Sequence, residues 1–397
     1  MKIKKPRGTK DIYGKEALKY RMIEDAGKKV AEKYNFQEMI TPVFEESELF
    51  KRSMGEETEV VNKQMYEFQD KNNREIALRP EGTAGVVRAY IENNLQSNIL
   101  YKKFFYYGSM YRYERPSSGR YREFRQFGIE KFGIESVIDE VEIFQIIVDI
   151  FDKLGLEIDL KINNIGCECR KEYIEKVKEY LEECKDRLGK VDVEKLDSGN
   201  ILRVLDSKDE KTIEVVKEAP NIIDYICEKC KESYNKLKVF LNELDIKYTE
   251  DFKMVRGLDY YSGNVFEVKI KEYEELGSVA GGGKYESLVE QLGGKKEVGF
   301  GFGIGVDRVV EALNEKETEE RLCYVVTIGK GLELEQHALK IAEQFRRYKE
   351  NNVVEIDVSE SSLKSKLRKA DKAGAEHVFI IGEEELKNNT YSIKTLK

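Results

Sequence analysis

Four arginines are the candidates for binding the phosphates of a nucleotide, because a guanidinium group matches phosphate geometry and keeps its charge. They are Arg112, Arg120, Arg256 and Arg308. The stretch RGLDYYSG (256–263) sets one of them beside an aspartate and two tyrosines between glycines. It predicts either a polar turn or the wall of a binding site. The sequence has no GxGxxG, and AGGGK lacks the earlier glycine and the Ser/Thr of a P-loop. Any nucleotide is therefore expected to bind through arginines on an antiparallel sheet.

Histidine limits the chemistry further. The chain has two histidines, His337 and His377, both near its C-terminal end. Acid–base or metal chemistry in the residues before His337 must work without an imidazole of the chain. This excludes Ser-His-Asp hydrolases and HExxH metalloenzymes there.

A hairpin is predicted over residues 101–133, where two strand-like runs flank a polar loop containing PSSG. Side chains on a strand alternate between its two faces. On one face this alternation gathers Arg112 and Glu114 from the first run with Gln126 and Glu130 from the second. The alternative is the solvated face of a half-exposed sheet.

LRPEGT (78–83) adds the carboxylate of Glu81 and the hydroxyl of Thr83. Together with Glu130 and Gln126, these groups could hold the ammonium group of a ligand.

VGFGFGIGVDR (298–308) alternates glycines with apolar residues, so one face of this strand is packed and the other carries no side chains. Glycine weakens a strand interior, and four glycines at alternate positions of one strand indicate close approach of a ligand or of another backbone. A flat base or sugar would suit that face. The alternative is tight packing of a helix on the sheet.

Composition bounds the class of protein. The chain has 397 residues, 40% of them hydrophobic and 36% charged, which indicates a globular protein of two or three domains. No apolar run reaches the roughly 20 residues of a membrane span, and the basic N-terminal stretch is not followed by the apolar run of a secretory signal. We expect a cytoplasmic protein with no membrane partner.

A net charge of −8 argues against a surface that binds nucleic acid everywhere, but not against a local basic patch.

The pattern of strands and helices divides the chain. Strand-like and helical runs alternate over 1–165, a mostly helical segment rich in Lys, Glu and Cys follows over 166–249, and strands resume over 250–320. We interpret 166–249 as an inserted module. Residues 321–397 alternate strand and helix in the manner of a small parallel α/β domain.

Six cysteines lie at positions 167, 169, 184, 227, 230 and 323. Cys227 and Cys230 form CxxC, but Cys167 and Cys169 form CxC and Cys184 stands alone, whereas a zinc site favours two well-spaced pairs. We expect thiols inside a helical module and no tightly bound protein metal, with a zinc site as the alternative.

Five stretches together resemble a known family. They are TPVFEESELFKRSMGEETEVV, LRPEGTAGVVRAY, YRYERPSSGRYREFRQFGIEKFG, RGLDYYSG and GFGFGIGVDR. They are similar to class II aminoacyl-tRNA synthetases and, within that class, to the histidyl-tRNA synthetase family; RGLDYY is the most specific stretch. The resemblance runs from PRGTKDI to the C-terminal domain. It implies an α+β fold with an antiparallel sheet flanked by helices, a helical insertion and a C-terminal α/β anticodon-binding domain.

The resemblance implies a role for each arginine. Arg112 would clamp the α-phosphate of ATP, and Arg256 would lie beside that phosphate and the amino acid carboxylate; these two are the catalytic candidates. Glu114 and Arg120 would position ATP, Phe124 would stack on adenine, and Arg308 would hold the far end of ATP.

The same resemblance implies a histidine site. Glu81, Thr83 and Gln126 would bind the α-amino group, with Gly82 between the first two. Glu130 and Tyr261, helped by Tyr260, would recognise the imidazole. Because imidazole has two ring nitrogens, a wrong amino acid would leave these partners unpaired. Lys284 and Glu286 depart mildly from the family pattern, which commonly has arginine and aspartate there.

The implied activity is ATP-dependent ligation of L-histidine to tRNA(His) through histidyl-adenylate, with Mg²⁺ accompanying ATP, in a homodimer. The C-terminal domain would contact the anticodon with a basic helix carrying Lys364, Lys366, Arg368, Lys369 and Lys372, although that helix could equally be an ordinary solvated face. The alternative function is that of the synthetase-like regulatory subunit of ATP phosphoribosyltransferase, which tends to lose RGLDYY and the anticodon domain. A generic RNA-binding module leaves Glu81, Glu130 and the glycine strand unexplained.

Overall fold

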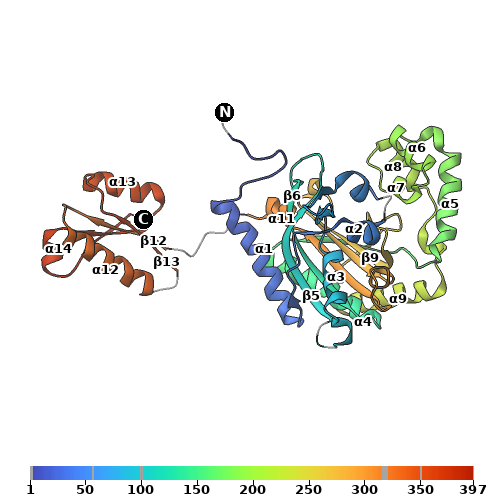
Figure 1. Cartoon of the computed structure of the whole chain (residues 1–397), viewed down its shortest axis with the longest axis horizontal. Helices are drawn as coiled ribbons and strands as arrows, with labels where there is room; N and C mark the ends of the chain where they lie inside the picture. Colours follow the sequence, from blue (N-terminus) through green and yellow to red (C-terminus); the bar gives the residue numbers. More distant parts are fainter. Residues whose placement is uncertain are drawn as a thin grey trace. The chain divides into compact units, whose positions relative to one another are not determined.

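The computed structural model describes residues 3–55, 58–98, 100, 102–314, 321–348 and 351–396. The chain separates into two compact units, Met1–Asn314 and Glu315–Lys397, and each is described by itself (Figure 1). Residues 56–57 of the predicted motif 41–61, and residues 315–320 at the predicted domain boundary, lie outside the described residues.

An eight-stranded sheet forms the centre of the first unit, in the order β1-β5-β6-β11-β10-β9-β7-β8. All neighbouring pairs are antiparallel except β1 with β5 and β7 with β8. This confirms the predicted antiparallel sheet. Its strands are β1 (Gln37–Glu38), β5 (Lys103–Tyr111), β6 (Glu123–Phe132), β7 (Ile158–Asn164), β8 (Thr249–Glu250), β9 (Tyr261–Ile270), β10 (Ala280–Tyr285) and β11 (Gly299–Gly305).

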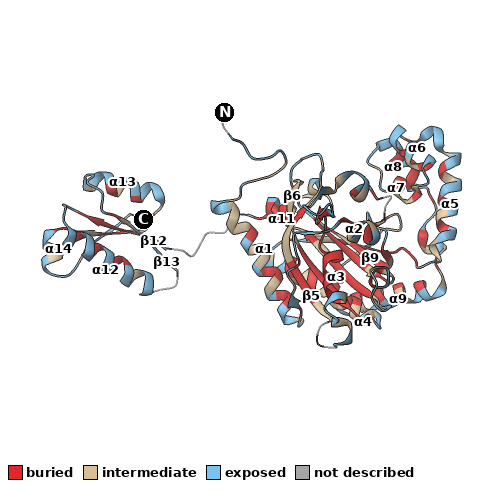
Figure 2. Ribbon diagram, viewed as in Figure 1, coloured by how far each residue is buried: buried red, intermediate tan, exposed pale blue. Residues whose placement is uncertain are grey.

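Four helices cover one face of this sheet and bury the largest core with it (Figure 2). They are α1 (Gly14–Lys33), α4 (Val137–Leu154), α9 (Glu228–Glu243) and α11 (Val306–Ala312). The start of α4 is fixed by a capping box between Ser136 and Asp139, which satisfies amide groups that the first helical turn leaves free. Helix α1 lies very close to the sheet: a Cβ on Gly27 would come within 2.6 Å of the Phe127 ring.

A small antiparallel sheet, in the order β2-β4-β3, and two helices pack in a second core that holds the start of α3 in place. These elements are β2 (Phe44–Glu46), β3 (Tyr66–Gln69), β4 (Glu75–Leu78), α2 (Ser47–Met54) and α3 (Thr83–Glu92). The short helices η1 (Val60–Gln64) and α10 (Leu288–Gln291) complete this region. LRPEGT thus runs from β4 into the first turn of α3.

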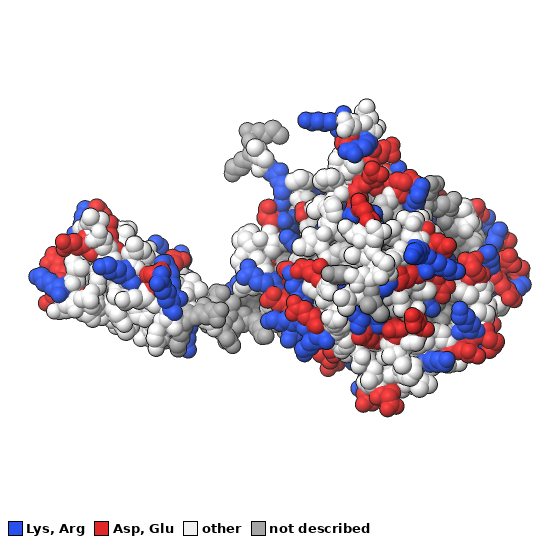
Figure 3. All heavy atoms as spheres, turned by 60° about the horizontal axis from the view of Figure 1, so that its bottom comes forward, with Lys and Arg blue, Asp and Glu red and all other residues white. Residues whose placement is uncertain are grey.

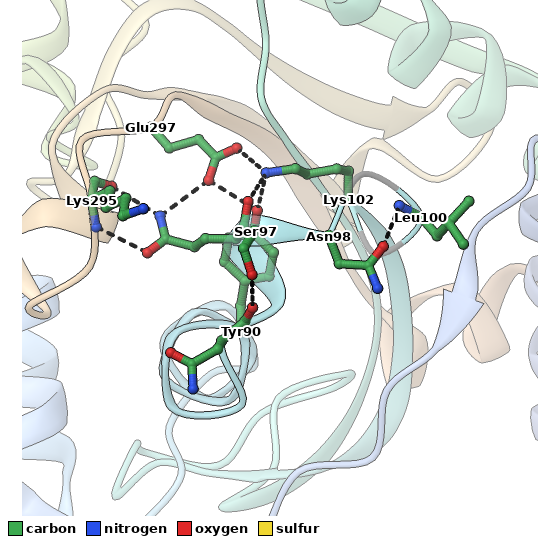
Figure 4. A network of polar contacts seen from close by, with 9 residues as sticks. Tyr90, Ser97, Asn98, Leu100, Lys102, Lys295 and Glu297 are labelled. Atoms are coloured by element: carbon green, nitrogen blue, oxygen red, sulfur yellow. Dashed lines mark hydrogen bonds and ion pairs between the residues drawn. The ribbon is translucent and has the colours of Figure 1, made fainter.

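A polar network ties the end of α3 to the segment before β11 (Figure 4). Lys102 donates to Glu297 over 2.6 Å, and the Tyr90 hydroxyl donates to the same carboxylate over 2.9 Å. The Gln96 amide bonds both Glu297 and the backbone at Lys295. Because Lys102 immediately precedes β5, this network fixes the start of the hairpin strand.

The predicted helical segment 166–249 contains two kinds of helix. Helices α5 to α8 lie together, apart from the main sheet (Figure 1). Helix α9, in contrast, packs on α4 and on β7 and β9, and buries Tyr234, Leu237 and Leu241 in the main core. The bounds of the others are α5 (Arg170–Glu183), α6 (Lys190–Asp197), α7 (Ile201–Leu205) and α8 (Glu210–Lys217), with single turns η3 (Lys185–Arg187) and η4 (Ile222–Asp224). A further single turn, η5 (Glu274–Leu276), follows β9.

The second unit is a four-stranded sheet in the order β13-β12-β14-β15. Strands β13, β12 and β14 are parallel, which confirms the predicted small parallel α/β domain. The additional strand β15 is antiparallel to β14. Helices pack on both faces and form two small cores. The elements are β12 (Arg321–Thr327), α12 (Leu332–Tyr348), β13 (Asn352–Asp357), α13 (Leu363–Ala373), β14 (His377–Ile381), α14 (Glu383–Lys387) and β15 (Ser392–Thr395).

Candidate functional site

A cavity of about 320 Å³ opens on the sheet face opposite α1 and α4, within the range of small-ligand sites. Its lining comes from the β5–β6 hairpin, the start of α3, the segment before β9, and strands β10 and β11. Eleven of the predicted site residues line it: Glu81, Thr83, Arg112, Glu114, Arg120, Phe124, Gln126, Arg256, Tyr260, Tyr261 and Arg308. RGLDYYSG is therefore a wall of a cavity. Gly82 and Glu130 lie behind the lining.

The hairpin places its side chains as the alternation predicted. Gly108 pairs with Gln126 and Met110 with Phe124, and Gln126 and Phe124 face the cavity. The intervening Arg125 lies on the other face, over the Tyr20 ring of α1. One detail differs: β5 ends at Tyr111, so Arg112 and Glu114 lie just beyond the strand that we expected to carry them.

The glycines of β11 mostly do not leave the open face for a ligand that we expected. A Cβ on Gly301 would lie 2.1 Å from Glu130 Oε2, and one on Gly303 would lie 2.4 Å from Gln126 Nε2. A Cβ on Gly299 would meet the Tyr285 ring at 2.1 Å. These three glycines thus make room for side chains from neighbouring strands, which lie flat across the sheet. Only Gly305, where the nearest atom would be 3.6 Å away, leaves open space toward the cavity.

This crowding predicts the effect of one added methyl group. Gly301→Ala should lower the free energy of unfolding by about 1–3 kcal/mol, the usual cost of overpacking, because the new Cβ displaces the Glu130 carboxylate. Gly305→Ala, on the same strand but facing open space, should change it by less than about 0.5 kcal/mol. Urea unfolding followed by circular dichroism measures both. Equal effects of the two substitutions would contradict the account.

Two buried carboxylates mark the inner end of the cavity: Glu81 lines it, and Glu130 lies behind the lining. Glu130 is 1% exposed and accepts hydrogen bonds from the hydroxyls of Thr83 (2.6 Å) and Tyr285 (2.8 Å). Glu81 is 3% exposed and accepts from the backbone N–H groups of Thr83 (2.6 Å) and Ala84 (2.7 Å), at the N-terminus of α3. Helix N-termini stabilise negative charge. The pair can therefore hold a cationic or hydrogen-bond-donating part of a ligand.

Burial is the largest cause that raises the pKa of Glu130 from its ordinary 4.5 to about 8, and the charge of Glu81 adds to it. Hydrogen bonds from Thr83 and Tyr285 act in the opposite direction. Burial also raises the pKa of Glu81. The hydroxyls of Tyr106, Tyr260 and Tyr285 have their pKa values raised in the same way, so they stay protonated and can donate.

A carboxyl group whose pKa is higher in the folded than in the unfolded protein stabilises the fold at pH values below the unfolded pKa. This stabilisation is lost as the pH rises from the unfolded pKa through the folded pKa. Between pH 4.5 and about 8, Glu130 should therefore lower the stability of the wild type by roughly 1.4 kcal/mol per pH unit. Glu130→Gln should flatten this slope, as measured by urea unfolding at several pH values.

A matched control is Glu140, another carboxylate 1% exposed, which accepts from Asn264 Nδ2 over 2.6 Å. Burial is the main cause raising its pKa to about 6, so Glu140→Gln should alter the slope only below that pH. If Glu130→Gln leaves the slope between pH 6 and 8 unchanged, the proton is not on Glu130.

The arginines give the outer part of the cavity its positive charge. Arg256 Nη1 is paired with Glu267 Oε1 at 2.7 Å, while its Nε is buried without a hydrogen-bond partner among the described residues. Arg112 Nε donates to the Pro80 carbonyl (2.8 Å), and its guanidinium lies 5.4 Å from the centre of the Phe124 ring.

Arg308 donates to the Ser278 carbonyl. Burial lowers its pKa, and the positive charges of Arg120 and Arg112 lower it further. Glu114 is the nearest counter-charge, 3.9 Å from Arg112 and 3.8 Å from Arg120. An anion between these three arginines would relieve their mutual repulsion.

Sequence reasoning missed three residues of this site. Tyr285 bonds Glu130, Glu267 pairs with Arg256, and Tyr106 donates to Gln126 over 3.2 Å. Each lies across from a glycine on the adjacent strand: Tyr285 opposite Gly299, Glu267 opposite Gly281, and Tyr106 opposite Gly128. The signal was a large side chain facing a glycine, which can be used only once the strand register is known.

Four of the six cysteines, which we predicted to be thiols inside a helical module, come together in space. The Sγ atoms of Cys167, Cys169, Cys227 and Cys230 all lie within 4.8 Å of one another. The spacings CxC and CxxC did not reveal this, because the fold brings the end of β7 against the start of α9.

The basic helix α13 offers fewer free cations than its sequence indicated. Lys366 is 1% exposed and donates to the Thr327 carbonyl at 2.8 Å, and Lys369 pairs with Asp357 at 3.0 Å. Lys364, Arg368 and Lys372 are exposed. Among the helices that the structure describes, none has the length and apolar character needed to cross a bilayer.

Comparison with known proteins identifies both units. The family model described as histidyl-tRNA synthetase matches residues 8–309, and that of an anticodon binding domain matches residues 322–397. Histidine–tRNA ligase of Aquifex aeolicus is 43% identical over 400 residues, covering 100% of this chain and 97% of the relative. That of Halothermothrix orenii is 41% identical over 406 residues, covering 100% and 95%.

Solved structures agree with these relatives. Apo histidyl-tRNA synthetase of S. aureus superposes with a TM-score of 0.79 at 33% identity, covering 100% of this chain and 95% of that one. A protein of Bacillus halodurans described as an ATP phosphoribosyltransferase regulatory subunit/histidyl-tRNA synthetase has a TM-score of 0.71 over 96% of this chain and 99% of that one, but at 20% identity this shows the shared fold alone. With its catalytic unit, its anticodon-binding unit and its full-length relatives in agreement, the chain belongs to the histidyl-tRNA synthetase family.

Proposed function

We propose that this protein ligates L-histidine to its cognate tRNA in two steps. A carboxylate oxygen of histidine attacks the α-phosphorus of ATP, which gives histidyl-adenylate and releases pyrophosphate. The 3′-terminal ribose hydroxyl of the tRNA then attacks the adenylate carbonyl and releases AMP. The observation that carries the proposal is a single cavity with arginines at its outer part and buried carboxylates at its inner end.

The outer part of the cavity suits ATP. Arg112, Arg120 and Arg308 would hold its phosphates, and Phe124 would stack on the adenine with Glu114 helping to position the nucleotide. The lowered pKa of Arg308 supports this assignment, because bound phosphate charge would offset the repulsion that now lowers it. Mg²⁺ would enter with ATP as its counter-ion and share the neutralisation of the phosphate oxygens.

Arg256 would stand between the two substrates. Its buried Nε has no hydrogen-bond partner among the described residues, and an unsatisfied buried donor costs about 1–3 kcal/mol. An oxygen of the α-phosphate or of the histidine carboxylate would satisfy it. Charge develops on the phosphorane during attack, so a fixed guanidinium there would stabilise the transition state.

The inner part of the cavity would bind histidine. Glu81, Thr83 and Gln126 would hold the α-amino group, with Gly82 allowing the backbone to pass close: a Cβ there would meet the Tyr106 ring at 2.2 Å. Glu130, Tyr260 and Tyr261 would recognise the imidazole. Attack by the substrate's own carboxylate needs positioning and charge stabilisation and no histidine base of the enzyme.

We also propose the cellular setting that goes with this activity. The catalytic domain would comprise residues 1–165 and 250–320, with 166–249 as an insertion and 321–397 as the anticodon-binding domain. The enzyme would act in the cytoplasm as a homodimer. The face of the chain drawn in Figure 3 carries charges of both signs side by side, so tRNA contacts would come from local groups such as Lys364, Arg368 and Lys372.

ATP–pyrophosphate exchange with each standard amino acid tests the function. We expect exchange with histidine alone, because the buried groups at the inner end would be left unpaired by other side chains. Absence of exchange together with tight histidine binding would overturn the proposal and indicate a histidine-binding regulatory subunit instead. Aminoacylation of tRNA(His) then tests the second step.

A further inference from the structure

The cluster of Cys167, Cys169, Cys227 and Cys230 lies outside the cavity and takes no part in the proposed reaction. The Sγ atom of Cys167 is 3.5 Å from that of Cys169 and 3.9 Å from that of Cys227. The Sγ atom of Cys169 is 4.0 Å from that of Cys230. All four are half-buried or buried.

These sulfur–sulfur distances match the geometry of a tetrahedral zinc site. Four thiolates at about 2.3 Å from a zinc ion at the centre of a tetrahedron lie about 3.8 Å from one another. A disulfide requires sulfur atoms about 2.05 Å apart. The three distances of 3.5, 3.9 and 4.0 Å agree with the edges of the tetrahedron, and all four sulfur atoms lie within 4.8 Å of one another. The three distances exceed a disulfide bond by a wide margin.

The backbone shapes both halves of the cluster. Gly166 turns the chain after β7 with a φ of +71°, and a Cβ there would come within 3.2 Å of Cys169 Sγ. Cys227 is the N-cap of α9, and Cys230 lies in its first turn. The backbone N–H of Cys227 also donates to Cys169 Sγ over 3.4 Å. Hydrogen bonds of this kind orient metal-binding sulfur atoms and tune their charge.

We propose that these four cysteines bind one Zn²⁺ ion as a closed structural site. Four sulfur ligands fill the tetrahedron and leave no position for water, which distinguishes a structural from a catalytic zinc. A set of four thiolates also selects zinc or iron over harder cations, and four sulfur atoms within 4.8 Å of one another fit a single ion.

The position of the site gives the ion a task that goes beyond the proposed reaction. Gly166 exchanges backbone hydrogen bonds with the β9 start: its carbonyl accepts from Gly263 N over 2.8 Å, and Ile165 N donates to the Gly263 carbonyl over 2.8 Å. Next to the cluster, Arg170 Nη1 donates to the Tyr261 carbonyl over 2.9 Å. Zinc would therefore lock the helical segment to the end of RGLDYYSG and hold the backbone of Tyr261 in place.

Metal analysis of the full-length wild type, purified without chelator, tests the proposal directly. We expect about one zinc per chain. Replacement by Co²⁺ should give the intense sulfur-to-cobalt charge-transfer and visible bands of a tetrahedral tetrathiolate. A mercurial that blocks thiols should release the zinc, as followed with a zinc indicator, and lower the temperature of unfolding.

Variants locate the ion. Cys227→Ser combined with Cys230→Ser should abolish zinc binding, whereas Cys184→Ser, in the same helical segment but outside the cluster, should keep about one ion per chain. If the double variant does not fold, zinc content and the cobalt spectrum of the wild type still decide the question.

Three results would overturn the proposal. The first is a folded wild type that contains no metal and in which the four cysteines of the cluster react as free thiols. The second is a protein mass that shows two disulfides among these four cysteines, and the third is iron bound in place of zinc. Because none of these measurements uses the exchange reaction, failure here leaves the proposed function untouched.

Discussion

Arg256→Ala will lower the rate of histidine-dependent ATP–pyrophosphate exchange by about 10²–10³-fold, the scale for removing one preorganised donor from a developing anion. The guanidinium is fixed before substrates arrive: Glu267 holds Nη1 at 2.7 Å, and a Cβ on Gly281 would lie 2.5 Å from the same atom. Its buried Nε has no hydrogen-bond partner among the described residues. A group held this way needs little reorganisation during the reaction, so its loss should reduce kcat rather than raise the KM values alone.

The controls for Arg256 separate charge from position. Arg52, exposed and paired with Glu48 at 2.8 Å on α2, should tolerate alanine without change in exchange. Arg256→Lys keeps a charge but loses the planar fork, and should recover only part of the rate. Glu267→Gln should fall between wild type and Arg256→Ala, because the guanidinium stays but loses its strongest anchor. An Arg256→Ala rate within a few-fold of the wild type would rule out the assigned role.

Local patterns predicted the faces of the strands well. The alternation of Phe124, Arg125 and Gln126 gave the correct side for each, because strand periodicity is a property of the backbone and needs no partner. The alternation of strand-like and helical runs in 321–397 similarly predicted the strands and helices of the second unit. Even the absence of P-loop motifs was informative, since the arginines do line an antiparallel sheet.

Pairings between distant segments could not be predicted in this way. The role of the glycine strand depends on its register with β6 and β10, which sets Gly301 against Glu130 and Gly299 against Tyr285. Without that register the glycines indicated open space for a ligand, whereas three of them receive side chains. The same reason hid the cysteine cluster, whose halves are about 60 residues apart in the sequence.

Burial also overrode charge patterns. Lys366 was grouped with solvent-facing cations of α13, yet its ammonium group donates to a backbone carbonyl beneath the helix. Helix α9 reads as part of an insertion by composition, but its apolar stripe joins the main core. In both cases the decisive contact comes from another element, about which the local sequence holds no information.

The second large effect concerns Glu130. Glu130→Ala should raise the KM for histidine by roughly 10–10²-fold, the range that follows from a cost of about 1–3 kcal/mol for leaving buried hydrogen-bonding partners unsatisfied. The KM for ATP should change little, because the arginines line the other part of the cavity. Glu130→Gln keeps the shape and one acceptor, and should give a smaller rise.

Glu130 holds two neighbouring side chains in place and would also recognise the imidazole of the substrate. Its two oxygens accept hydrogen bonds from the hydroxyls of Thr83 and Tyr285, so its loss leaves Thr83, which lines the cavity, without this partner. Glu140→Gln is the matched control: it changes an equally buried carboxylate that accepts from Asn264, whereas Glu130 accepts from Thr83, which lines the cavity. Its KM for histidine should stay near the wild-type value. If Glu130→Ala instead raises the KM for ATP and leaves that for histidine unchanged, the inner end of the cavity does not bind histidine, and the assignment of the two ends must be reversed.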